Sequence, residues 1–253
     1  MKVIHDTLIV YRRQIRHSLR QPAWLVFALV QPVFYLVLFG PLLEQVANTP
    51  GFPEGNAWSV FVPGLLVQLG IFGTLFAGFG LIEQLRDGII DRMRVSPMSR
   101  VAILMGNVLR DATVLIVQAT ILTVLAIPFG LNLTWQALVG GLIAVILLAI
   151  SFASISYAIA MVAKDEEPLV GVLNLFSPPL LLLSGILLPM TLAPQWLQYV
   201  SDANPVKHVV DGLRQLFYGE LWNSTVGWGL FAVTLMAVVC VAGATRTFQR
   251  ENP

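Results

Sequence analysis

The chain has 253 residues, of which 57% are hydrophobic and only 11% charged, and its net charge is +1. A water-soluble domain carries about 25% charged residues, so this composition indicates a protein whose solvent is the lipid bilayer. The near-neutral charge argues against a nucleic-acid-binding protein. The single cysteine, Cys240, excludes an intrachain disulfide and a thiolate metal cluster.

Residues 3–21 have the pattern of an amphipathic helix that lies in the membrane interface. Apolar residues recur at spacings of three and four, and arginines occupy other faces. Such a helix places its cations near anionic lipid headgroups. The apolar residues are Ile4, Leu8, Tyr11, Ile15 and Leu19, and the arginines are Arg12, Arg13, Arg16 and Arg20.

Six apolar runs follow that are each long enough to cross a bilayer, which takes about 20 residues in a helix. They cover residues 24–43, 60–82, 103–128, 136–162, 169–188 and 226–245. Because the bilayer core offers no water to backbone groups, these runs are expected to be helical. We therefore predict an all-α integral membrane protein with six transmembrane helices, which form a single transmembrane domain over residues 1–253.

The positions of the basic residues predict the orientation of these spans. Of the 15 Lys and Arg residues, all but Lys207 and Arg214 lie in or next to the segments that share one side of the membrane with residue 1. Basic residues near the ends of spans favour the cytoplasmic side. We therefore expect a multi-pass protein of a bacterial-type plasma (inner) membrane, with both termini in the cytoplasm.

Two polar segments between the spans have a more regular arrangement of polar and apolar residues than a simple loop would need. Residues 83–100 interleave charges of both signs with apolar residues, which predicts a short amphipathic helix that ends near Ser96-Pro97 and serves as a partner surface. A loop lying on lipid is the alternative. Residues 189–222 predict two short helices that re-enter the outer leaflet, or that rest on it as an interfacial lid. In the second helix, Lys207, Asp211 and Arg214 share one face and can pair.

Both segments resemble motifs of type-2 ABC exporter permeases, and most closely those of the daunorubicin-resistance type. The first resembles their first cytoplasmic loop through Glu83, Gly88, Arg92 and the run Val95-Ser-Pro-Met-Ser-Arg100, although Gln84 stands where the family has an arginine. The second resembles a signature near their C-terminus. Its residues here are Pro189, Met190, Pro194, Trp196, Leu197, Asn204, Pro205 and Arg214.

The resemblance implies a permease that works as a homodimer or pseudo-dimer with two ATPase subunits. The chain has no Gly-x-x-x-x-Gly-Lys-[Ser/Thr] phosphate loop, so ATP and magnesium are expected in the partner subunit, and no catalytic, cofactor or metal site is expected here. Residues 83–100 would be the coupling helix that docks into the ATPase. The residues expected to make this contact are Glu83, Arg86, Asp87, Ile89, Ile90, Asp91, Arg92, Met93 and Arg94.

Polar residues within the apolar runs are candidates for lining the transport pathway, because such residues are costly in a bilayer and face protein. Hydrogen bonding between helices is the alternative for each. The candidates are Gln31, Gln68, Gln118, Asn174 and Ser177. Arg110 and Asp111 are instead expected to form a local ion pair or anchor.

The substrate is expected to be a hydrophobic or amphipathic compound such as a drug or antibiotic, since the spans hold no charged residue at mid-depth. A permease for a glycolipid or a cell-wall polymer is the alternative. A membrane-embedded lipid phosphotransferase is a remote one, suggested by Asp87 to Arg92, but Gln84 and Val101 stand where that site needs Asp and Gly.

Overall fold

A computed structural model describes residues 2–20, 22–42, 56–88 and 100–250, and in this part of the chain every regular element is helical. The amphipathic segment forms α1 (Lys2–Arg20). The long elements are α2 (Pro22–Phe34), which continues as the π-helical turn η1 (Tyr35–Phe39), α4 (Ala57–Leu75), α5 (Ala77–Arg86), α7 (Arg100–Ala126), α8 (Trp135–Ala163), α9 (Glu166–Leu183) and α12 (Ser224–Arg250). Shorter ones are η2 (Ile127–Phe129), η3 (Met190–Leu192), α10 (Gln195–Asp202) and α11 (Pro205–Phe217).

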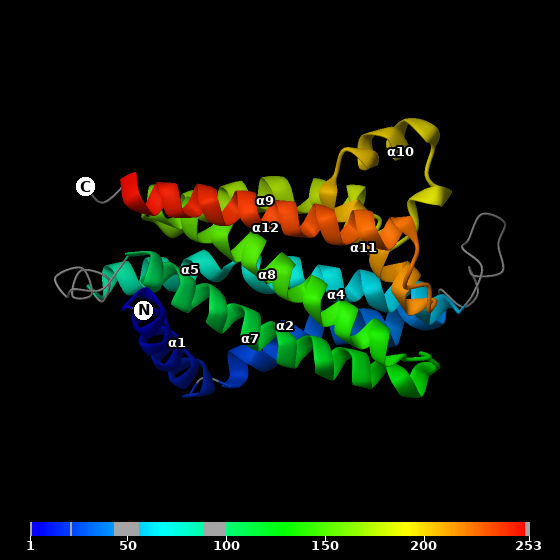
Figure 1. The fold of residues 1–253 in the computed structure, drawn as a ribbon, viewed down its shortest axis with the longest axis horizontal. Helices are drawn as coiled ribbons and strands as arrows, with labels where there is room; N and C mark the ends of the chain where they lie inside the picture. Colours follow the sequence, from blue (N-terminus) through cyan, green and yellow to red (C-terminus); the bar gives the residue numbers. More distant parts are fainter. Residues whose placement is uncertain (1, 21, 43–55, 89–99, 251–253) are drawn as a thin grey trace.

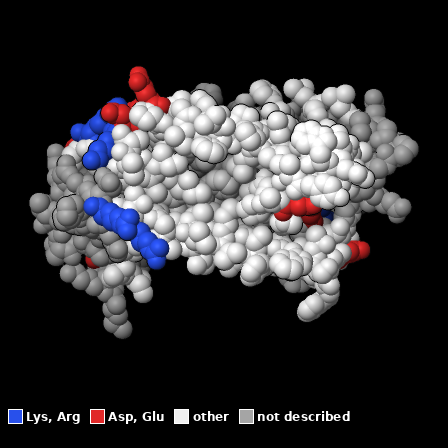
Figure 2. All heavy atoms as spheres, turned by 90° about the horizontal axis from the view of Figure 1, so that it is seen from above, with Lys and Arg blue, Asp and Glu red and all other residues white. Residues whose placement is uncertain are grey.

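The long helices lie roughly along one axis, and α4 with α5, then α7, α8, α9 and α12 run alternately in opposite directions (Figure 1). The chain therefore returns to the same end of the bundle several times. The start of α1, the end of α5, the start of α7, the α8–α9 turn and the end of α12 lie at this end, and α10 projects from the opposite one. We call the first the terminal end and the second the hairpin end. Figure 2 shows one face on which Lys, Arg, Asp and Glu gather towards the two ends, with uncharged side chains between them.

Four helices in the described residues are long and apolar enough to cross a membrane: Ala57–Arg86, Val101–Phe129, Trp135–Ala163 and Ser224–Phe248. They coincide with four of the six predicted runs, so the chain is a multi-pass membrane protein. The remaining two runs are helical but shorter. In the run 24–43 the helix contains Pro32 and the turn η1, and its apolar part is Leu29–Leu42. The run 169–188 corresponds to α9, whose 18 residues end at Leu183. The count of six spans stays a prediction.

The centre of the bundle is formed by α4 and α8. Nearly every side chain of α4 is buried, and α8 contacts α4, α5, α7, α9, α11 and α12. Small residues allow close approach: a Cβ at Gly229 of α12 would lie 2.6 Å from the carbonyl oxygen of His208 in α11. In a bilayer, where lipid tails are as apolar as leucine, such close packing is a main source of helix association.

The break between α4 and α5 at Phe76 is closed by a side chain from α8. Ser156 Oγ accepts a hydrogen bond of 2.9 Å from the Gly78 N–H and donates one of 2.6 Å to the Leu75 carbonyl. Both backbone groups are freed by the break and both are buried. Ser156 therefore takes the place of the water that such groups would bind in a soluble protein.

Aromatic side chains are exposed at the hairpin end. Trp135 begins α8, Trp228 lies in the first turns of α12, and Trp196 and Tyr199 lie on α10. Tryptophan and tyrosine are enriched where a membrane protein meets the lipid headgroups, since one part of each ring is apolar and another forms hydrogen bonds. These residues thus mark one boundary of the apolar belt.

Ser156→Ala is expected to lower the stability of the protein by about 1–2 kcal/mol, because it leaves the Leu75 carbonyl and the Gly78 N–H without a partner. The matched control is Ser154→Ala, since the buried Ser154 hydroxyl has no hydrogen-bond partner in the described residues. The measurement is the thermal unfolding midpoint in a mild detergent. Equal midpoints for the two variants would contradict the role given to Ser156.

Candidate functional site

At the terminal end, residues from three parts of the chain meet around the C-terminus of α5. Glu83 and Arg86 lie in the last turn of α5, and Asp87 is its C-terminal cap. The chain turns there at Gly88, whose φ of +65° is one that glycine adopts without strain. The predicted second span thus continues as helix to Arg86. Six of the predicted coupling residues lie outside the described residues: Ile89, Ile90, Asp91, Arg92, Met93 and Arg94.

Arg86 connects the end of α5 to the short turn between α8 and α9. Its guanidinium lies 2.6 Å from a carboxylate oxygen of Glu166 and 3.4 Å from one of Asp165. All three side chains are largely exposed, so the pairs contribute at most about 1 kcal/mol to stability. Their importance is positional, since they hold the ends of two separate helices together at the surface.

The helix α1 is fixed to the same place from the other side. Gln14 Nε2 donates a hydrogen bond of 2.9 Å to Gln84 Oε1 on α5. The Tyr11 hydroxyl lies 3.2 Å from Thr113 Oγ1 on α7. A Cβ at Gly106 would lie 2.6 Å from the Val10 side chain, so α1 and α7 touch closely. Gln84, which departs from the family pattern, is therefore the residue through which α1 contacts α5.

A cavity of about 640 Å³ opens between these elements. Phe76 and Phe79 form an apolar part of its lining, and their ring centroids are 6.0 Å apart. The lining also contains basic and acidic side chains: Arg13, His17, Arg110, Glu83, Asp87 and Glu166. Within the described residues no group of three or more His, Cys, Asp or Glu side chains is placed to hold a metal ion. The site is suited to contact with a charged partner.

Arg110 and Asp111 form the ion pair that was predicted for them. The Arg110 guanidinium lies 3.1 Å from Asp111 Oδ1, and the buried Tyr157 hydroxyl of α8 donates a hydrogen bond to Asp111 Oδ2. The carboxylate is thereby held by partners on α7 and α8. Tyr157 was not identified from the sequence, although a carboxylate inside an apolar run signals that a further donor is needed.

The structure does not bring the five predicted pathway residues together. Gln31 of α2 and Asn174 of α9 are exposed on the outer surface of the bundle. Gln68 of α4, Gln118 of α7 and Ser177 of α9 are buried, and the Ser177 hydroxyl donates to the Leu173 carbonyl of its own helix. None of the five lines the cavity at the terminal end.

The segment 189–222 contains the two predicted short helices. Pro189 precedes the turn that begins at Met190, and Pro194 precedes α10. Asn204 caps α11 by accepting a hydrogen bond of 3.0 Å from the Val206 N–H, and Pro205 is the first residue of that helix. The apolar face of α11 is buried against α4, α8 and α12.

Arg214 of α11 connects three segments at the hairpin end. Its Nε donates a hydrogen bond of 3.1 Å to the Val60 carbonyl of α4, and its Nη2 donates one of 2.7 Å to the Gly185 carbonyl after α9. Its Nη1 lies 3.6 Å from Asp211. The predicted pairing of Asp211 with Arg214 is therefore correct. The predicted pairing of Lys207 within the same group is wrong, because Lys207 pairs with Asp202 instead. The hydrogen bond from Lys207 lowers the pKa of the exposed Asp202 carboxyl.

Arg214→Gln is expected to destabilise the protein by about 2–4 kcal/mol, because the carbonyl groups of Val60 and Gly185 lose their donors inside the bundle. Lys207→Gln is the control, since it removes an equal charge from the same helix but breaks a pair whose carboxylate is exposed. Thermal unfolding in detergent measures both. A Lys207→Gln variant as unstable as Arg214→Gln would show that lost charge, and not lost carbonyl donors, is responsible.

Comparison with known proteins gives consistent matches. A family model described as ABC-2 type transporter matches residues 5–218. A protein of Cyanophora paradoxa, named as a transport permease, is 26% identical over 221 residues, which are 87% of this chain and 76% of the relative. The daunorubicin resistance ABC transporter permease of Streptomyces coeruleorubidus is 26% identical over 235 residues, 91% and 81% of the two chains. A probable multidrug ABC transporter permease of Escherichia coli is 27% identical over 193 residues, 70% and 49% of the two.

Proposed function

Because the chain belongs to the ABC-2 type transporter family, we propose that it is the membrane-spanning permease subunit of an ATP-driven exporter, with the terminal end in the cytoplasm. The permease relatives imply an ATPase as a separate partner. The observation that supports docking at the terminal end is the convergence there of the α5 C-terminus, the α8–α9 turn and α1. We propose that residues 83–100 form the coupling segment, with Glu83, Arg86 and Asp87 as its described part.

A displacement at this segment would reach the core of the protein directly. The stretch Ala57–Arg86 runs from the hairpin end to the terminal end. Of an apolar part of 18 residues within this stretch, 67% is buried inside the protein. Arg86 also connects it to α9 through Glu166. Two consecutive helices that are exposed at one end and packed along the rest can convert docking movements into tilting of their neighbours.

The proposed assembly contains two ATPase subunits and a second permease copy or homologous permease. All of residues 1–253 would form one transmembrane domain with six spans, both termini in the cytoplasm and the multi-pass bundle in a bacterial-type plasma membrane. Gln31 and Asn174 are exposed on the outer surface, which supports our proposal that they face a second permease. They are the pathway candidates we retain at that interface, and Gln68, Gln118 and Ser177 would act within one bundle.

We propose a hydrophobic or amphipathic drug-like compound as the substrate. The uncharged middle of the surface in Figure 2 and the names of the daunorubicin and multidrug relatives favour it. A glycolipid or cell-wall polymer is the competing substrate class. We propose no catalytic role for this chain itself, because hydrolysis of ATP would take place in the partner subunit.

Reversing the charge at Arg86 tests the coupling segment. Arg86→Glu is expected to reduce the ATPase activity of the purified permease–ATPase complex several-fold, because it sets like charges against Asp165 and Glu166. The double variant Arg86→Glu with Glu166→Arg should recover much of the activity. The unfolding midpoint should hardly change in either, as expected for exposed pairs.

The matched control for this test is Arg246→Glu, an exposed arginine near the end of α12 that is also at the terminal end. An equal loss of activity in Arg246→Glu, or no recovery in the double variant, would contradict a specific role of the Arg86–Glu166 contact.

Export of a drug-like compound predicts lower intracellular daunorubicin in cells that express the chain with its ATPase than in cells with a Walker-motif variant of that ATPase. Fluorescence of the retained drug is the measurement. Equal retention, combined with loss of a labelled polyprenyl-linked sugar from the inner leaflet, would move the assignment to the polymer class.

A further inference from the structure

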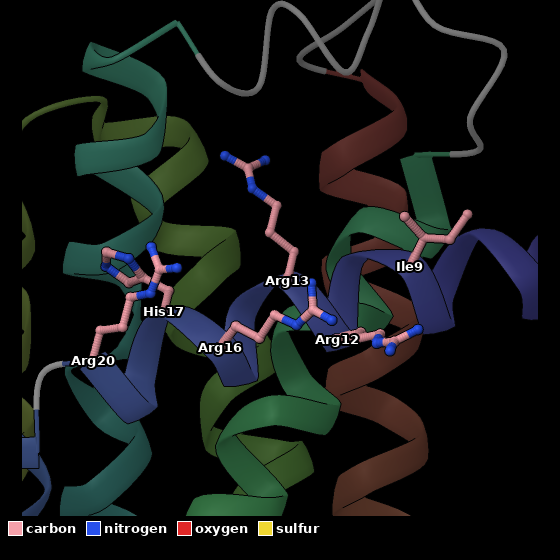
Figure 3. A pocket seen from close by; sticks show the side chains of 6 residues that line it. All are labelled: Ile9, Arg12, Arg13, Arg16, His17 and Arg20. Atoms are coloured by element: carbon pink, nitrogen blue, oxygen red, sulfur yellow. The ribbon is translucent and has the colours of Figure 1, made fainter.

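The helix α1 carries a concentration of positive charge that the transport function does not use. Arg12, Arg13, Arg16, His17 and Arg20 line a surface pocket of about 520 Å³ together with Ile9. Figure 3 shows their side chains extending from this one helix. No carboxylate within the described residues forms an ion pair with any of the four arginines.

The helix α1 has three faces, spaced by roughly a third of a turn, since each residue turns an α-helix by about 100°. The first is buried against α7 and α5 and contains Asp6, Val10 and Gln14. The second is apolar and exposed: Ile4, Leu8 and Leu19 are 68%, 52% and 69% exposed. The third, which we call the cation face, consists of Arg12, Arg13, Arg16, His17 and Arg20.

The cation face lacks the negative charge that would balance it. Arg12, Arg16 and Arg20 follow one another at intervals of four residues, and like charges at this spacing repel in a helix. Arg13 and His17 also line the neighbouring cavity with Glu83, Asp87 and Glu166, but Arg12, Arg16 and Arg20 do not. A guanidinium group presents a planar fork of donors that fits two oxygens of a phosphate. The surface therefore suits a phosphate-bearing ligand.

The neighbouring apolar face shows what else the ligand must carry. Three exposed large aliphatic side chains beside a row of arginines form the pattern of a helix embedded at the level of lipid headgroups. An acidic surface of the ATPase could match the charges, but it would leave Ile4, Leu8 and Leu19 uncovered. A molecule with both a phosphate and acyl chains satisfies the two faces together.

We propose that the cation face of α1 binds the phosphate headgroups of anionic phospholipids, while Ile4, Leu8 and Leu19 contact their acyl chains. The lipid is a bound component of the protein and not its cargo, so the site does not depend on which compound is transported. Because Gln14 and Val10 fix α1 to α5 and α7, the bound lipid lies directly beside the proposed coupling segment.

The experiment uses the purified full-length chain in mild detergent, depleted of anionic lipid, and measures bound lipid by native mass spectrometry. The probes are phosphatidylglycerol, phosphatidylcholine and inorganic phosphate, added separately. We expect preferential binding of phosphatidylglycerol, and a roughly tenfold loss of its affinity in Arg12→Gln with Arg16→Gln, because each basic residue near a headgroup layer contributes to the attraction. Arg246→Gln with Arg250→Gln removes the same charge from the same end of the molecule and should change the affinity less than twofold.

The unmodified protein provides a test that needs no variant, since its preference for phosphatidylglycerol should weaken as salt rises. Several outcomes would overturn the proposal: equal losses in the two double variants, a preference that salt does not affect, or inorganic phosphate binding as tightly as the lipid. A variant Arg12→Gln with Arg16→Gln that keeps the lipid but no longer co-purifies with the ATPase would assign the cation face to the protein partner instead.

Discussion

The structure depends on one constraint, which is that a backbone group inside a bilayer has no water to bind. Wherever a long helix breaks, another part of the chain must supply the missing partners. Ser156 does so at the break between α4 and α5, and Arg214 does so for the Gly185 carbonyl where the chain leaves α9, while it also donates to the Val60 carbonyl of α4. Each side chain comes from a helix other than the one it satisfies, so the same hydrogen bonds that complete a break also hold neighbouring helices together.

The two ends of the bundle are therefore built differently. At the hairpin end, the buried guanidinium of Arg214 binds backbone carbonyls, and α11 packs on three long helices. At the terminal end, the contacts of α5 with α9 and α1 are an exposed ion pair and one hydrogen bond between amide side chains. Exposed ion pairs are weak and exchange readily with water. The end proposed to receive the ATPase is thus the more easily rearranged of the two, and it is connected to the core by the consecutive helices α4 and α5.

Composition and periodicity were enough to predict the helices but not their contacts. The run 136–162 became α8 (Trp135–Ala163) nearly residue for residue, because Thr134 caps its start and Lys164 and Asp165 end its apolar sequence. The Arg110–Asp111 pair was also predicted correctly. The interruption of the first run at Pro32 and Tyr35–Phe39 was not predicted, since an apolar run has the same composition whether its helix is regular or contains a π-helical turn.

The contacts of the site that were not predicted from the sequence were missed for a common reason. Uniformly apolar helices carry no polar stripe that would show which face meets which neighbour, so the pairing of Tyr157 with Asp111 could not be read from either helix alone. The same holds for Gln14 with Gln84 and for Arg86 with Glu166, which lie 70 and 80 residues apart in the sequence. The pairing of Lys207 with Asp202 was missed because the prediction used helical periodicity. That periodicity does not extend across the turn before Asn204, and Asp202 lies on the other side of this turn.

The exposed tryptophans of the hairpin end have a mechanical consequence. With aromatic rings at one lipid–water boundary and the arginines of α1 at the other, vertical sliding of the bundle would drag either set into hydrocarbon or out into water. Depth in the membrane is then fixed, and rearrangement of the spans is restricted to leaning and flexing. The discontinuity at Phe76, bridged by a single serine hydroxyl, is where a long central helix flexes at the lowest cost.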